Sequence, residues 1–181
     1  MFEIEQLIED CRGALKEKDT RHAVHEIVAR VVSDPSRVIQ ALGEPTLAGI
    51  DTVYRADDLT ILNISWAPGM TLHPHDHRMW AVIGIYGGRE DNVFYRRTPE
   101  GLQQHGTKAL HAKNAIPLGE DIIHTVHNPS EQLTIALHVY GGDFFATPRS
   151  EWDPETLEER PYDVENTRRV FEDANRRINT S

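Results

Sequence analysis

Residues 69–77 read GMTLHPHDH and residues 117–128 read PLGEDIIHTVHN, and together they hold five of the ten histidines of the chain. On a β-strand, side chains two residues apart share a face, so His75 and His77 can offer two neighbouring ligand positions to one metal ion. In the second stretch, a Pro- and Gly-containing turn leads to His124, which can supply a third ligand from another strand. A lone His-x-His is common on protein surfaces, but the two framed stretches together predict a three-histidine metal site. Three imidazoles suit Zn, Cu, Fe or Ni, and ligand softness does not choose among these metals.

The sequence between about residues 44 and 150 is typical of an all-β structure. Short runs rich in β-branched and aromatic residues alternate there with Gly, Pro and Asn, which favours a sandwich or barrel over βαβ units. The expected strands are Leu59–Trp66, Trp80–Tyr86, Asn92–Arg96, Ile122–His127 and Leu133–Tyr140.

The two ends of the chain differ from this central part. Apolar residues recur at helical spacing before residue 43, and Asp34-Pro35 predicts the start of a short helix that Gly43 ends. Residues 151–181 are charged and contain a helical pattern around Val164–Ile178. We therefore expect a helical segment over 1–43 packed on the barrel, a barrel with the metal site over 44–150, and a charged extension over 151–181.

Composition excludes several classes of function. The chain has 181 residues and a formal net charge of −10, which disfavours binding to phosphate backbones or to anionic membrane surfaces. It has one cysteine, Cys11, so a framework of intrachain disulfides cannot form. Neither a signal-peptide pattern nor an apolar run of membrane-spanning length is found, and a reducing cytoplasm is the expected location.

The framing of the histidines resembles the cupin superfamily. Its first motif is Gly, five residues, His-x-His, and a glutamate three or four residues further on; its second is Pro-x-Gly, a few residues, His, three residues, and Asn. The matching residues here are Gly69, His75, His77, Pro117, Gly119, His124 and Asn128. The resemblance implies a mainly β protein with the cupin double-stranded β-helix, a jelly-roll barrel, carrying N-terminal helices and a short C-terminal helix.

The chain departs from the cupin motif at the glutamate. Ala81 and Val82 stand where that ligand is expected, and Glu90 lies too far along the sequence to replace it. The expected metal site is therefore His75, His77 and His124 with no carboxylate. Three neutral ligands leave the full +2 charge on a divalent metal, which favours an anionic ligand such as a thiolate or carboxylate.

An all-histidine cupin site is similar to that of the thiol dioxygenases, cysteine dioxygenase and 3-mercaptopropionate dioxygenase. The resemblance covers about residues 53–149 and includes Trp66, His75-Asp76-His77, the 123–130 stretch, and His138-Val-Tyr140-Gly-Gly-Asp143. It implies a cytoplasmic oxidoreductase with one non-heme Fe(II) per chain, which uses O2 to convert a small mercapto-carboxylate into its sulfinate. The implied partners are a small thiol and O2, with no nucleic acid and no membrane.

The resemblance also implies catalytic roles for His138 and Tyr140. They match the last two members of a Ser-x-His-x-Tyr relay beside the iron, but Ala136 stands at the serine position. The relay is therefore expected to be truncated. The cysteine that cross-links to the tyrosine in animal cysteine dioxygenases falls at Val82, so no such cross-link can form.

An arginine is needed to bind the substrate carboxylate through paired N–H donors. Arg55 matches the cysteine dioxygenase position if a loop is shortened, and Arg149 matches the mercaptopropionate enzymes. Gly-Gly-Asp143 resembles the second branch, which favours Arg149.

Other residues are assigned lesser roles. His73 is expected beside the ligands or in a channel, Trp80 is a candidate pocket wall, and His127 is expected on the opposite face of its strand from His124. The acidic run from Glu151 to Glu165 is expected to be a solvated face.

Two other functions stay open at the level of sequence. One is a cupin metalloenzyme that acts on a non-thiol substrate with Mn, Ni or Zn, and the other is a cupin that binds a metal or ligand without turnover. The sequence leaves open the thiol, the metal, the arginine that is used and the oligomeric state.

Overall fold

A computed structural model describes residues 3–179 of the chain. Three helices come first, α1 (Ile4–Ala14), α2 (Thr20–Val32) and α3 (Pro35–Leu42), and α4 (Val164–Asn179) lies at the other end. Between them run strands β1 (Gly49–Arg55), β2 (Thr60–Trp66), β3 (Thr71–Asp76), β4 (Ala81–Gly87), β5 (Arg89–Thr98), β6 (Gly101–His111), β7 (Ala115–Leu118), β8 (Ile123–His127), β9 (Thr134–Tyr140), β10 (Ser150–Trp152) and β11 (Glu159–Pro161).

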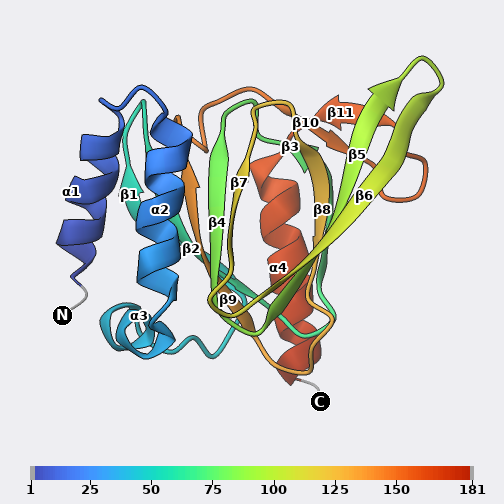
Figure 1. Cartoon of the computed structure of the whole chain (residues 1–181). Helices are drawn as coiled ribbons and strands as arrows, with labels where there is room; N and C mark the ends of the chain where they lie inside the picture. Colours follow the sequence, from blue (N-terminus) through green and yellow to red (C-terminus); the bar gives the residue numbers. More distant parts are fainter. Residues whose placement is uncertain (1–2, 180–181) are drawn as a thin grey trace.

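The strands form two antiparallel sheets, with the orders β1-β2-β9-β4-β7 and β11-β10-β3-β8-β5-β6. Consecutive strands often lie in different sheets, so the chain winds between the two and encloses an interior (Figure 1). This arrangement is the double-stranded β-helix, and it confirms the expected fold class with helices at both ends.

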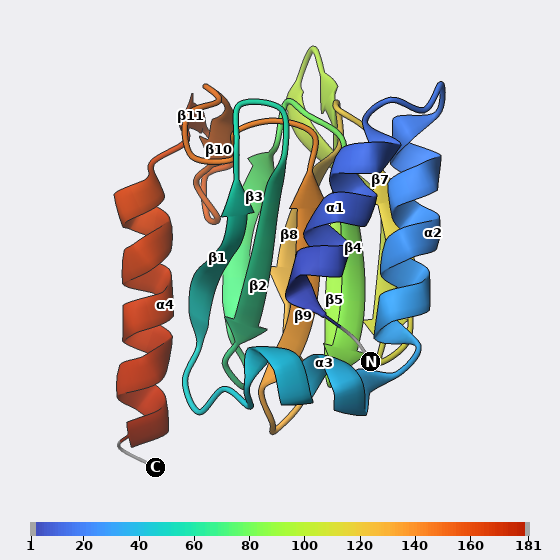
Figure 2. The same cartoon turned by 90° about the vertical axis from the view of Figure 1, so that its left-hand side faces the viewer.

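The N-terminal helices cover the outer face of the five-stranded sheet. Strands β2 and β9 are buried along their whole length, because one face packs on α1 and α2 while the other faces the interior of the barrel. Helix α2 approaches β4 closely: a Cβ added at Gly84 would lie 2.4 Å from Val28 Cγ1. Figure 2 shows α1–α3 on one side of the strands and α4 on another.

Helix α4 packs beside β1. The Asn175 side chain bonds to both the N–H and the C=O of Ala48, and the ring of Phe171 lies 5.3 Å from that of Trp66. Strands β10 and β11 extend the six-stranded sheet, with Glu151 opposite His75. The expected division at residues 43 and 150 stays a prediction, and its residues 1–2 and 180–181 lie outside the described part.

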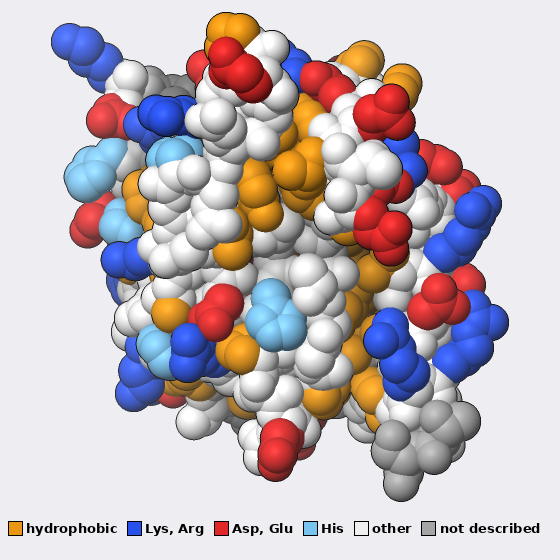
Figure 3. Space-filling model, turned by 90° about the vertical axis from the view of Figure 1, so that its right-hand side faces the viewer, with side chains coloured by type: hydrophobic (Ala, Val, Ile, Leu, Met, Phe, Trp, Pro, Cys, Tyr) orange, Lys and Arg blue, Asp and Glu red, His pale blue; other side chains and the backbone are white. Residues whose placement is uncertain are grey.

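The predicted helices and the five predicted strands are all present. Strand β6 was not expected, because it is polar and mostly exposed and pairs only with β5, with which it projects beyond the rest of the barrel (Figure 1). The face in Figure 3 carries scattered charged side chains of both signs, with hydrophobic side chains showing between them. Across residues 3–179, no helix has the length and apolar character needed to cross a membrane.

Candidate metal centre

Three buried histidines meet inside the barrel. His75 lies on β3, His77 follows the end of that strand, and His124 lies on the neighbouring β8, in register with His75. Their ligand nitrogens all lie within 4.8 Å of one another. The ring centroids are 4.7 to 5.1 Å apart. The structure thus brings together the three residues that the sequence singled out.

Hydrogen bonds orient two of these rings. His75 Nδ1 lies 3.0 Å from the carbonyl oxygen of His73, and His124 Nδ1 lies 2.7 Å from Asn92 Oδ1. Each contact places the proton on Nδ1 and leaves Nε2 free as a ligand. His124 Nε2 and His77 Nδ1 are buried and have no hydrogen-bond partner among the described residues.

The surroundings keep these imidazoles neutral, which is the form that binds a metal. Burial lowers the pKa of His124 to about 3, with a smaller contribution from the charge of His138. Burial also holds the pKa of His75 and of His77 well below the usual range, and the neighbouring histidines add to the effect. Unpartnered nitrogens on neutral rings fit a divalent transition metal, so the group could bind one. No carboxylate belongs to this group.

His138 and Tyr140 face the same cavity from β9. Tyr140 Oη lies 3.0 Å from His138 Nδ1, and the Tyr140 ring packs edge-on against His77 at 5.1 Å between centroids. Burial lowers the pKa of His138 to about 3 and raises the pKa of Tyr140 above its usual range. The expected pair is therefore present beside the histidine group.

Glu90 is a buried residue of the site that sequence reasoning missed. It lies on β5, is fully buried, and places Oε2 3.9 Å from His138 Nε2, while its Oε1 accepts a 2.9 Å hydrogen bond from Asn92. Ala136 leaves the relay without the serine hydroxyl, as expected, and a carboxylate from the other sheet lies beside His138. A signal was available: Glu90 is two residues before Asn92 and so shares its inward face.

The two candidate arginines differ sharply. Arg55 is half-exposed and makes a bidentate ion pair with Asp143, at 2.9 to 3.1 Å, so it is already neutralised outside the cavity. Arg149 is 7% exposed, and its guanidinium lies between the rings of Phe144 and Tyr162, 4.2 and 3.8 Å from their centroids. Its Nε and Nη2 have no partner within residues 3–179.

Arg149 also lies close enough to influence the site electrostatically. Its positive charge is among the causes that lower the pKa of His75 and His77, after burial and the neighbouring histidines. A buried cation without a counter-ion is costly, so this position is suited to an incoming anion.

His73 acts on the site through its backbone, because its ring turns away toward Glu151. Its Nε2 lies 3.0 Å from Glu151 Oε2, and Glu151 also accepts hydrogen bonds from Arg160, Asn166 and the backbone of Asp163. Glu151 is 1% exposed, so the expectation of a solvated acidic face is wrong at its first residue. This carboxylate fixes the C-terminal segment to the ligand strand.

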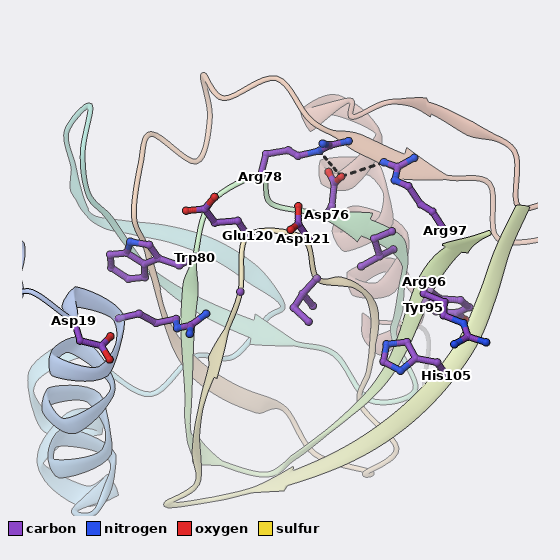
Figure 4. A pocket seen from close by; sticks show the side chains of 14 residues that line it. Asp19, Asp76, Arg78, Trp80, Tyr95, Arg96, Arg97, His105, Glu120 and Asp121 are labelled. Carbon is purple, nitrogen blue, oxygen red and sulfur yellow. Dashed lines mark hydrogen bonds and ion pairs between the residues drawn. The ribbon is translucent and has the colours of Figure 1, made fainter. Parts of the chain in front are cut away.

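Trp80 lines a pocket, but that pocket is not the histidine cavity. It lies at one end of an open cleft outside the barrel wall, where the Asp76 carboxylate sits between Arg78 and Arg97 (Figure 4). Asp76 points outward because it alternates with the inward-facing His75. His127 also points away from the site, as expected, and bonds Thr71.

The cavity at the histidines is small and closed. Its volume is about 20 Å³, which is room for roughly one water molecule. Behind it, a groove of about 270 Å³ lies between β1 and α4, and four residues line both spaces: Ile50, Phe144, Tyr162 and Thr167. These four side chains form the partition between the groove and the histidines.

The topology and this cavity define a cupin-type double-stranded β-helix with a buried three-histidine group able to hold a metal. No family model matches the chain. Similar solved structures include an RmlC-like cupin family protein with a double-stranded β-helix fold from Methanocaldococcus jannaschii, at 9% identity over 57% of this chain and 87% of that chain, with a TM-score of 0.48. A cupin superfamily protein from Desulfitobacterium hafniense has 13% identity over 56% and 83%, with a TM-score of 0.45.

Oxalate oxidase in complex with the substrate analogue glycolate has 13% identity to the chain. The match covers 55% of this chain and 53% of that chain, with a TM-score of 0.44. At these identities and scores, the likeness does not extend to substrate or reaction.

Proposed function

We propose that this protein is an Fe(II)-dependent dioxygenase that converts a small mercapto-carboxylate into its sulfinate. The observation that carries the proposal is a buried group of three neutral histidines, without a carboxylate, close to a buried arginine that lacks an anion. Such a site lacks negative charge to balance the metal ion and the arginine. A substrate that bears both a thiolate and a carboxylate would provide this negative charge. Bound Fe(II) would supply the redox chemistry that allows O2 to react with a thiol.

Within this proposal, Arg149 binds the substrate carboxylate through its free Nε and Nη2 donors. The cation–π contacts of its guanidinium with the Phe144 and Tyr162 rings restrict the orientation of those donors, so little conformational freedom is lost on binding. Tyr140 and His138 face the reacting end of the substrate. The apolar walls, which include Leu72 and Val126, exclude water and strengthen each electrostatic contact.

The overall reaction balances without another reductant: RSH + O2 gives RSO2H. The S–H and O–O bonds break and two S–O bonds form, while the sulfur loses the four electrons that O2 accepts. The product ionises at neutral pH and releases its proton to water.

Substrate entry requires movement of the partition, because the cavity of about 20 Å³ does not admit a mercapto acid. The groove beside α4 is the natural route, since Tyr162 and Phe144 face it and also line the histidine cavity. Displacing these rings would open the cavity, and their return would close it over the substrate.

The test is anaerobic reconstitution of the full chain with Fe(II), followed by O2 uptake with 3-mercaptopropionate, cysteine and cysteamine. The proposal expects thiol-dependent uptake and a product 32 mass units heavier than the thiol. Cysteamine lacks a carboxylate and should be the poorest substrate. The absence of uptake with every thiol, from protein with a full complement of iron, would overturn the proposal.

Two alternatives are separate outcomes of the same preparation. Stoichiometric Zn or Mn without iron, in protein purified with no added metal, would favour a metalloenzyme that acts on a non-thiol substrate. The substitution at Ala136 is the feature that supports this alternative. Metal binding without any product would favour a binding protein.

A further inference from the structure

Glu90 is the one carboxylate buried in the barrel interior beside the His138–Tyr140 pair, within the described residues. It reaches the pair from the opposite sheet, since β5 belongs to the six-stranded sheet and β9 to the five-stranded one. Trp66 Nε1, His138 Nε2 and Glu90 Oε2 are buried and make no hydrogen bond of good geometry among the described residues, although the Trp66 N–H lies close enough to Glu90 to lower the pKa of its carboxyl. Three buried polar atoms with unmet hydrogen-bonding capacity among residues 3–179 therefore lie close together.

The orientation of Glu90 follows from the ligand His124. Because His124 offers Nε2 to the metal position, its Nδ1 carries a proton and Asn92 Oδ1 must accept it. The Asn92 amide nitrogen then points to Glu90 Oε1, which can only accept. Any proton on Glu90 must therefore reside on Oε2, the oxygen that faces His138.

We propose that Glu90 is a positioning residue at the far end of a relay, Tyr140–His138–Glu90, and that it receives the proton that the substrate thiol loses on binding. The inference rests on the proposed function only in naming the thiol as the proton source. The gap of 3.9 Å between Glu90 Oε2 and His138 Nε2 exceeds a hydrogen bond, and a side-chain shift of about 1 Å closes it.

The relay has two states, set by the charge of Glu90. An ionised Glu90 accepts from His138 Nε2–H, so His138 Nδ1 accepts the Tyr140 proton and Tyr140 offers a lone pair to the cavity. A protonated Glu90 donates to His138 Nε2, so Nδ1–H donates to Tyr140, whose O–H then points into the cavity.

Conversion between the states carries one proton out of the cavity. The thiol S–H bond breaks as Tyr140 takes that proton, Tyr140 passes its own to His138 Nδ1, and His138 passes its Nε2 proton to Glu90 Oε2. The substrate becomes a thiolate and Glu90 becomes neutral, with no electrons transferred.

The protonation of Glu90 is suited to this role. Burial raises its pKa to about 7, against the opposing effects of the Asn92 amide and the Trp66 N–H. The other elements bring few charges to it: the titratable groups nearby are His138 and Tyr140 on β9, His124 behind Asn92, and Asp91 next in the chain. Leu110, opposite it on β6, is apolar.

The test is the protonation state of the His138 ring, measured by ¹⁵N NMR on the full chain, metal-free and loaded with diamagnetic Zn(II). In the wild type, the proton should move from Nδ1 to Nε2 as the pH rises, with a midpoint near the pKa of Glu90, about 7. In Glu90→Gln, the Gln amide donates to His138 Nε2, so the Nδ1–H form should persist at every pH. Asp91→Asn is the matched control and should keep the switch.

A His138 ring with one unchanging tautomer in the wild type between pH 6 and 9 would overturn the proposal, and this measurement needs no variant to fold. The same tautomer in Glu90→Gln and the wild type at high pH would also overturn it. If the enzyme oxidises thiols, the profile of kcat/KM against pH should lose its acid limb in Glu90→Gln. The rate of this variant should also be about 10²-fold lower than that of the wild type. The tautomer is read without turnover, so failure of the relay and failure of the thiol reaction are told apart.

Discussion

Acidification should destabilise the metal-free protein, and the size of the effect follows from the buried titratable groups. His124 and His138 each have a pKa lowered to about 3, compared with 6.5 for a free histidine. Below pH 6.5 the unfolded chain therefore binds protons that the folded chain does not, and the free energy of unfolding decreases as the pH is lowered. Between pH 7 and 5 each group costs about 2 kcal/mol.

Glu90 acts in the opposite direction. Its pKa is raised to about 7 from 4.5, so the folded chain binds a proton first and stability rises as the pH falls from 7. Over the same interval it adds about 2 kcal/mol. The wild type should therefore lose at least about 2 kcal/mol between pH 7 and 5, whereas Glu90→Gln, without the compensating carboxylate, should lose at least about 4 kcal/mol. The lowered pKa values of His75 and His77 increase both losses.

Both losses in the free energy of unfolding can be measured by urea unfolding in the presence of a chelator, at pH 7 and at pH 5, with tryptophan fluorescence as the signal. Carboxylates with lowered pKa values, such as Asp143, titrate below this window and do not contribute. His105→Gln changes an exposed histidine and should leave the loss as in the wild type. Equal stability of the wild type at the two pH values, or equal losses in wild type and Glu90→Gln, would refute the reasoning.

Three further predictions test other parts of the structure. Arg149→Met should raise KM for an anionic substrate about 10²-fold, because a buried positive charge is lost. Arg55→Met should change KM less than about twofold, and initial rates or calorimetric titration measure both effects. Asn128→Ala removes three hydrogen bonds from its amide to carbonyls, at 2.8 to 3.1 Å, and should cost about 2–4 kcal/mol in urea unfolding while metal stoichiometry is unchanged. Gly84→Ala should lower the thermal midpoint, at a cost of about 1–3 kcal/mol, because the new methyl meets Val28 on α2.

Much of the site was readable from local sequence. Strand alternation placed His138 and Tyr140 on one face, and the glycine and proline turns framed the strands that carry His75 and His124. Asp34-Pro35 and Gly43 marked the ends of α3, where Gly43 adopts a φ of +87°. These features are coded within a few residues of each other, so the period of the strand or helix is enough to predict them.

The errors arose where a role depends on a distant partner. Glu151 stands in an acidic run that looks solvated, yet strand pairing places it opposite His75 and buries it. Trp80, just before β4, lines a cleft outside the barrel and not the histidine cavity.

The sequence by itself determined an all-β central part with helices at both ends and the three candidate ligand histidines, because these follow from short-range periodicity and turn residues. The double-stranded β-helix was implied by the resemblance of the histidine motifs to those of cupins. Only the tertiary structure decided that Arg149 is buried without an anionic partner among residues 3–179 while Arg55 is paired with Asp143, and that Glu90 faces His138. Those outcomes depend on which strands of opposite sheets come face to face, and that register is fixed by the packing of the whole barrel.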